Sequence, residues 1–222
     1  LDGFRAWLPD HADVVFEPAN GPIIVEREVE KMSKSKYNVV NPDHIIDEHG
    51  ADALRLFEMF LGPIQQSKPW DTKGLSGVTG FLRKVMRLMD RVEDIEESKD
   101  EQRVLHVLMD KVERDIASLS LNTSVSAMMI AVNQWLEMPK LSKASMKDFA
   151  IILSPFAPHV TEEIWQLLGG SKSITLVPYP QLNKAMLVND EVTYPVQFNG
   201  KTRFMLTVAA SADKAVIEAM VM

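Results

Sequence analysis

The chain contains no cysteine, which excludes a disulfide framework and any zinc site built on thiolates. Its five histidines are too scattered to predict a metal site. No apolar run approaches the roughly 18 residues of a membrane span, and no secretory leader is visible. The formal net charge of −7 argues against a protein that holds nucleic acid through its overall field. These absences predict a cytoplasmic chain without a metal of its own, a membrane partner or a DNA partner.

The bulk composition is that of a globular protein. The 222 residues are 46% hydrophobic and 25% charged, which allows a substantial core and one or two domains. The sequence starts at Leu1 without an initiator methionine and ends at Met222 inside a helix-like stretch. We therefore expect a fragment of a longer protein.

The most informative feature is the pentapeptide Lys31-Met32-Ser33-Lys34-Ser35, which follows a strand-like run and precedes a helix start. Lysine is a compact point charge with three donors on a flexible stem, which suits a phosphate group whose charge moves during reaction. Two lysines on one loop can stabilise negative charge on a departing pyrophosphate. Taken alone the pentapeptide is a weak signal, because short basic runs are usually solvated surface.

The longer string 30–43, EKMSKSKYNVVNPD, resembles the second signature of the class I aminoacyl-tRNA synthetases. The strings at 50–56, 58–63 and 66–71 are similar to the sequence that follows it, and the last two resemble leucyl-type enzymes in particular. Further resemblance lies at 154–159 and 196–201. Tyr37 departs from the pattern, because glycine is commoner at that position.

The resemblance implies an enzyme that activates leucine with ATP and Mg²⁺ to leucyl-adenylate and transfers it to tRNA(Leu). It places Lys34, and with it Lys31, at the ATP phosphates in an electrostatic catalytic role. Ser33 and Ser35 would bind the phosphates or orient the loop. Asn38 is a plausible loop-fixing residue, since asparagine bonds nearby backbone and tolerates left-handed conformations.

The other class I signature, H-x-G-H, does not occur in these residues. The half-site for adenine and the α-phosphate is therefore missing, and the fragment alone should be inactive. Two alternatives stay open: a stand-alone tRNA-binding module without catalysis, and a sister class I enzyme of the valyl, isoleucyl or methionyl type.

Apolar spacing predicts a mostly helical fold with a change of pattern near residues 72 and 171. The resemblance implies that residues 1–71, with short β-like runs at 14–16 and 23–25, are the tail of a Rossmann-type catalytic domain with the lysine–serine loop. It also implies that the helical bundle of residues 72–170 is a tRNA-binding bundle of the anticodon-binding type. Its five helices are expected at about 72–98, 101–119, 122–138, 145–153 and 157–169.

Residues 171–222 are predicted to be a linker, extended over 174–180, followed by part of a small α/β domain. The Asn199-Gly200 pair predicts a β-hairpin of 193–198 and 201–208 with a type I′ turn, and a helix follows at 213–220.

Basic residues at helical spacing give a candidate RNA contact. Arg83, Arg87 and Arg91, with Lys84 beside them, would form a stripe about 12 Å long on the first bundle helix. A solvated face paired with nearby acids is an equal alternative. Lys201 and Arg203 at the hairpin tip are further candidates. Arg55 and His159 favour structural roles, as an ion pair and at a helix start respectively.

Overall fold

The computed structural model describes residues 28–188, 191–209 and 211–221. The chain divides into two compact units, Leu1–Val40 and Asn41–Met222. The described chain is mostly helical, as predicted, and none of its helices is long and apolar enough to cross a membrane. The β-like runs predicted at 14–16 and 23–25 lie outside the described residues.

Two short helices begin the second unit. Helix α2 (Pro42–His49) starts where the Asn41 side chain accepts a hydrogen bond from the Asp43 amide, with proline at the first helical position. Gly50 ends α2 with a φ of 87° and leads directly into α3 (Ala51–Phe60). Only glycine adopts this backbone conformation without strain, which explains the sharp elbow between the two helices.

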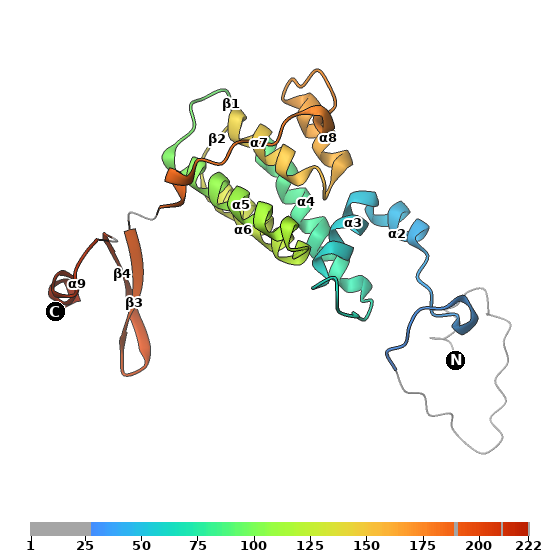
Figure 1. The fold of residues 1–222 in the computed structure, drawn as a ribbon, viewed down its shortest axis with the longest axis horizontal. Helices are drawn as coiled ribbons and strands as arrows, with labels where there is room; N and C mark the ends of the chain where they lie inside the picture. Colours follow the sequence, from blue (N-terminus) through green and yellow to red (C-terminus); the bar gives the residue numbers. More distant parts are fainter. Residues whose placement is uncertain (1–27, 189–190, 210, 222) are drawn as a thin grey trace, which may run out of the picture. The chain divides into compact units, whose positions relative to one another are not determined.

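Five helices form the bundle: α4 (Leu75–Met89), α5 (Lys99–Ala117), α6 (Leu121–Glu137), α7 (Lys143–Leu153) and α8 (Pro158–Leu167). Figure 1 shows α5 and α6 side by side, and α3 packs on both α4 and α6. The largest wholly buried side chains come from α3 to α7 and the short segments on either side of α7, so one apolar core joins these helices. The core includes Leu56, Leu75, Leu88, Leu105, Met109, Met128, Trp135, Leu141, Met146, Phe149, Ile152 and Phe156.

The first bundle helix is shorter than the predicted span of 72–98. Helix α4 ends at Met89, and residues 92–93 form strand β1 (Val92–Glu93), which pairs in parallel with β2 (Leu141–Ser142). The sequence pattern missed this break because the apolar stripe continues through Val92. The partner strand lies about fifty residues away in the chain, beyond the reach of periodicity.

Helix α5 begins with a capping box that fixes its start. The Ser98 hydroxyl accepts from the Glu101 amide, and the Glu101 carboxylate accepts from the Ser98 amide. The other Glu101 oxygen accepts from the Ser142 amide at 2.7 Å, so this buried carboxylate joins the α5 start to β2. Removing an acceptor from buried amides leaves them unsatisfied, which makes Glu101 a structural residue.

The segment after α8 follows the bundle as a linker with two short 3₁₀ turns, η4 (Ile174–Leu176) and η5 (Lys184–Leu187). The prediction of a wholly extended 174–180 is therefore wrong at its start, where the Ser173 side chain accepts from the Thr175 amide and promotes the turn. Turn η5 packs on α5, and the Asn183 amide donates to Nδ1 of His106. Burial lowers the pKa of His106, and the negative charge of Glu97 opposes part of this shift. The lowered pKa favours the neutral ring, which can accept this hydrogen bond.

The hairpin forms as predicted, with slightly longer strands. Strand β3 (Glu191–Phe198) pairs antiparallel with β4 (Lys201–Ala209), and helix α9 (Lys214–Val221) follows. Asn199 and Gly200 both have positive φ, 50° and 74°, as a type I′ turn requires.

Candidate functional site

The lysine–serine loop closes on itself around a short 3₁₀ turn, η2 (Lys34–Lys36). The Lys36 amide donates to the Ser33 carbonyl at 3.0 Å, and the hydroxyls of Ser33 and Ser35 lie 2.9 Å apart. Lys34 therefore lies in the chain between two serines whose hydroxyls bond each other. Ammonium and hydroxyl groups are the kinds of donor that suit phosphate oxygens.

Asn38 holds the two ends of the loop together. Its Oδ1 accepts from the Ser33 amide at 2.8 Å, and its Nδ2 donates to the Lys31 carbonyl at 3.3 Å. One side chain thus fixes the backbone at Lys31 and at Ser33. The loop-fixing role predicted for Asn38 agrees with this geometry.

The three lysines of the loop differ in their partners. Lys36 pairs with Glu30 at 2.7 Å, whereas no acidic side chain among the described residues pairs with Lys31 or Lys34. Both of these ammonium groups belong to exposed residues. Among the described residues, no ion pair has to break before these two ammonium groups can meet an anion.

Tyr37, the departure from the family pattern, ends the turn in the left-handed region with a φ of 53°. A non-glycine residue there costs about 1–2 kcal/mol. This explains why glycine suits the position, while leaving every charged group of the loop in place.

Replacing Asn38 tests whether the loop has to be held closed. The class I resemblance implies that a longer protein binds ATP at this loop. In that protein, Asn38→Ala removes both tethers and is expected to raise KM for ATP by roughly threefold to tenfold, since each neutral hydrogen bond contributes about 0.5–1.5 kcal/mol. Asn38→Asp keeps the acceptor for the Ser33 amide and should lose less. A KM equal to wild type in Asn38→Ala would show that the tethers do not organise the phosphate site.

The predicted basic stripe on α4 divides into two pairs. The Arg91 guanidinium donates to the carbonyls of Leu136 and Met138, so it caps the end of α6. Lys84 donates to Asn133 Oδ1 at 2.8 Å. Arg83 and Arg87 are exposed, and no acid among the described residues pairs with them. The structure thus gives Arg91 a structural role in place of the predicted solvent-facing one, because the chain turns after Met89.

The hairpin candidates lie on exposed backbone. Lys201 and Arg203 are both exposed beside the turn, and a register shift follows Val196. Their contact with RNA stays a prediction.

Sequence reasoning assigned no role to Asp52, a buried acid on α3. One carboxylate oxygen accepts from the Val160 amide at 2.7 Å, and the other lies 2.8 Å from Nδ1 of His159, at the start of α8. Its neighbour Arg55 donates to the Pro155 carbonyl at 2.7 Å, a hydrogen bond in place of the predicted ion pair. The sequence did contain a signal for this role, because Asp52 lies four residues before Leu56 and so falls within the apolar stripe of the helix.

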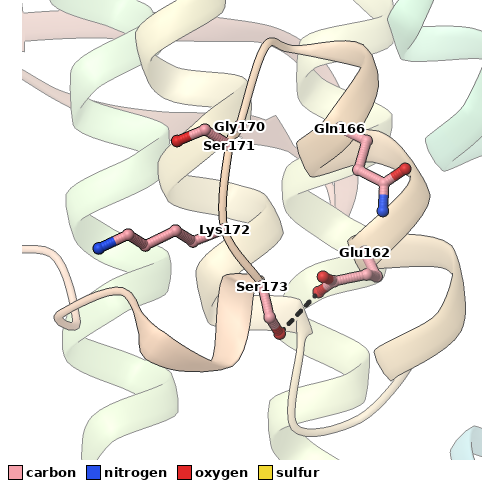
Figure 2. A pocket seen from close by; sticks show the side chains of 6 residues that line it. All are labelled: Glu162, Gln166, Gly170, Ser171, Lys172 and Ser173. Atoms are coloured by element: carbon pink, nitrogen blue, oxygen red, sulfur yellow. Dashed lines mark hydrogen bonds between the residues drawn. The ribbon is translucent and has the colours of Figure 1, made fainter.

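An open depression beside α8 holds no part of the phosphate loop. Figure 2 shows its lining, with the Ser173 hydroxyl directed at Glu162 and Lys172 pointing away from that carboxylate. Glu162 also accepts from the Ile174 amide at 3.0 Å, which pins the linker to the helix. A Cβ at Gly170 would lie 2.1 Å from Nε1 of Trp165, so the tight turn here requires glycine. We interpret the depression as a structural feature, formed where the linker packs against α8.

The donor set fits a polyphosphate better than a protein-bound metal. The loop offers ammonium and hydroxyl groups, while the described part of the chain contains no group of three or more His, Cys, Asp or Glu residues placed to hold a metal ion. Magnesium brought to such a loop would depend on phosphate oxygens for its ligands.

Two family models match the chain. Residues 102–218, more than half of the 222, match the anticodon-binding domain of tRNA ligase, and residues 19–71 match the tRNA synthetases class I (I, L, M and V). The second match spans the lysine–serine loop, α2 and α3. The first spans α5 to α8, the linker and the hairpin.

Curated relatives extend the likeness to the whole chain. The chain is 50% identical to a leucine–tRNA ligase of Flavobacterium psychrophilum over 96% of its length, and 48% identical to one of Porphyromonas gingivalis over 98%. These matches cover only 23% and 24% of the relatives, so the chain spans about a quarter of their length.

A solved structure agrees with the sequence matches. The LeuRS–tRNA–LeuAMS ternary complex of Agrobacterium radiobacter K84 matches 86% of this chain and 28% of that one, with a TM-score of 0.68 and 29% identity. The resemblance read from the motifs is thereby confirmed. The chain belongs to the family of anticodon-binding domains of tRNA ligases, and over its whole length it matches leucine–tRNA ligases.

Proposed function

We propose that this chain is the part of a leucine–tRNA ligase that supplies the ATP-phosphate loop and a tRNA-binding bundle. The observation that carries the proposal is the closed loop at 31–38, where Lys31 and Lys34 carry no acidic partner among the described residues. The enzyme would act in the cytoplasm on leucine, ATP and tRNA(Leu).

The reaction needs stabilisation of charge on the leaving group. A leucine carboxylate oxygen bonds to the α-phosphorus of ATP, the bond from that phosphorus to the bridging oxygen breaks, and pyrophosphate leaves with the electron pair. Lys34 and Lys31 would stabilise the negative charge that builds on the departing phosphates, which lowers the barrier more than it tightens ground-state binding. Ser33 and Ser35 would donate hydrogen bonds to the same oxygens.

Magnesium would bind to phosphate oxygens of ATP and supply positive charge that neutralises part of the negative charge of the phosphates. The loop lysines would neutralise part of the same negative charge on the phosphates. We assign no protein ligand for it within this chain. The adenine and α-phosphate half-site would come from the rest of the enzyme, which is why this chain alone should not catalyse the reaction.

The bundle would contact the tRNA through Arg83 and Arg87. These exposed arginines lie four residues apart on α4, so they share one helix face and can follow a phosphate backbone. Phosphate contacts position a protein on RNA without reading its sequence, which suits binding to the tRNA body. The proposed basic set also includes Lys84, Arg91, Lys201 and Arg203. Arg91 would act indirectly, because its guanidinium donates to carbonyls at the end of α6.

The arginine contact predicts a change in salt dependence. In the full-length enzyme, Arg83→Ala and Arg87→Ala should each weaken tRNA(Leu) binding and lower the slope of log affinity against log salt by about one. Arg114→Ala is the matched control, because Arg114 is an exposed helix arginine already paired with Asp110 at 2.7 Å. Equal slopes in all three variants would remove Arg83 and Arg87 from the interface.

Charging of tRNA tests the proposal as a whole. The full-length enzyme is expected to attach leucine to tRNA(Leu), and the isolated 222-residue chain to bind that tRNA without charging it. Binding without charging by the full-length protein would favour the alternative of a stand-alone tRNA-binding module. Charging with valine, isoleucine or methionine instead would move the chain to a sister class I enzyme.

A further inference from the structure

Three lysines gather where α7 and α8 meet the start of the linker. The Lys147 ammonium lies 5.6 Å from the centroid of the Trp165 ring, within the range of a cation–π contact. The Trp165 indole donates to the Lys172 carbonyl at 2.9 Å. A Cβ added at Gly169 would lie 3.9 Å from Nζ of Lys143. We call Lys143, Lys147 and Lys172 the lysine corner.

Short-range geometry builds the lysine corner from two sides. Lys143 and Lys147 are four residues apart on α7, so they share one helix face at a spacing of about 6 Å along the axis. On the other side, Gly170 turns the chain back onto Trp165, because its amide donates to the Trp165 carbonyl at 2.9 Å. The backbone of Lys172 is therefore held on α8, although this residue belongs to the linker.

The three ammonium groups carry charge that the chain does not neutralise. None of them pairs with an acid among the described residues, and all three residues are at least partly exposed. Glu162 of α8 accepts from the Ile174 amide at 3.0 Å, and Figure 2 shows Lys172 pointing away from this carboxylate. The lysine corner is thus a positive surface on a chain whose net charge is −7.

Other lysines of the bundle differ in this respect. Lys111 pairs with Asp115 at 2.6 Å, and Lys140 pairs with Glu93 at 2.7 Å. Like charges four residues apart on a helix repel each other, so Lys143 and Lys147 weaken the fold slightly. Folding alone therefore gives no reason for the unpaired lysines, whereas an anionic partner does.

We propose that the lysine corner binds the sugar–phosphate backbone of tRNA, in addition to the contact proposed at Arg83 and Arg87. This inference rests on the proposed function, which makes tRNA the partner. Lysine ammonium groups are compact charges that suit phosphate oxygens. Contacts to phosphates position an RNA without reading its sequence, so the lysine corner orients the tRNA body on the bundle.

The test is the salt dependence of tRNA(Leu) binding by the full-length enzyme. Replacing all three lysines with glutamine removes three positive charges and keeps most of the side-chain volume. The slope of log affinity against log salt is expected to fall by about two to three, since each neutralised phosphate contributes about 0.7–0.9. The melting temperature should stay close to that of wild type, because no ion pair among the described residues is lost.

Lys140→Gln is the matched control. Lys140 is an exposed lysine three residues before Lys143, and its replacement removes the same charge, but its ammonium is already paired with Glu93. Each single glutamine variant of the lysine corner should lower the slope by about 0.7–0.9. Lys140→Gln should lower it by less than about half as much.

The outcomes separate this inference from the proposed function. An unchanged slope in the triple variant, or equal losses in Lys140→Gln and the single variants, would overturn the inference even if Arg83→Ala and Arg87→Ala lower the slope. A triple variant with a lower melting temperature and an unchanged slope would overturn it in favour of an acidic protein surface on the lysine corner. A wild-type enzyme that does not bind tRNA(Leu) would overturn the proposed function, and the inference would fall with it.

Discussion

Replacing Lys34 with alanine in the full-length enzyme is expected to lower kcat for leucine-dependent ATP–pyrophosphate exchange on the order of 100-fold to 1,000-fold. This is the usual cost of removing one preorganised donor from charge that develops in a transition state. Lys34 lies on the 3₁₀ turn, in the chain between the two serines, without an acidic partner among the described residues. KM for leucine should change little, because the ammonium acts on the phosphates.

Lys36 provides the matched control for this variant. It lies two residues away on the same exposed turn, but its ammonium is paired with Glu30 at 2.7 Å. Lys36→Ala should therefore change the rate by no more than about fivefold, in line with the modest energy of surface ion pairs. Equal losses in the two variants would mean that the loop responds to total charge, and that Lys34 has no special place.

Replacing Trp135 with alanine is expected to destabilise the bundle by about 3–5 kcal/mol. The side chain is fully buried on α6, and its ring meets Phe149 of α7 edge to face with centroids 5.2 Å apart. Truncation removes this contact and leaves a cavity between two helices. Urea unfolding of the 222-residue chain, followed by far-ultraviolet circular dichroism, measures the loss as a lower midpoint.

Trp135→Phe separates packing from polarity at the same position. The indole Nε1 is buried and has no hydrogen-bond partner among the described residues, so its removal relieves an unsatisfied donor. That relief offsets part of the lost volume, and we expect a cost of at most about 2 kcal/mol. A phenylalanine variant as unstable as the alanine variant would show that the N–H has a partner in solution.

Local patterns in the sequence predicted most elements of the fold. The start of α2 follows from Asn41-Pro42-Asp43, and the hairpin turn follows from Asn199-Gly200, since these residues determine backbone geometry within a few positions. Apolar spacing located α5 to α8 to within about two residues at most ends. The lysine–serine loop was singled out through the longer string 30–43, because the pentapeptide alone is a weak signal, and its place at the ATP phosphates stays a prediction.

Long-range contacts were beyond such reasoning. No residue near Arg91 in the sequence indicates that its guanidinium caps α6, some 45 residues later. The predicted basic stripe therefore extended beyond the end of α4 at Met89. The pairing of β1 with β2 depends likewise on segments distant in the chain, and so does the contact of Asp52 with the start of α8. A buried charge is detectable in a pattern as an anomaly, as at Asp52, but its partner is visible only in the fold.

We infer that this loop serves the activation of leucine. The most direct test of this inference is ATP–pyrophosphate exchange by the full-length protein with each of the twenty amino acids in turn. We predict strong exchange with leucine, at a rate at least about tenfold above the rates with isoleucine, valine and methionine. A binding pocket can distinguish these four amino acids only by small differences in the shape of their apolar side chains. Strongest exchange with another amino acid, or no exchange with any of them from a folded protein, would contradict the claim.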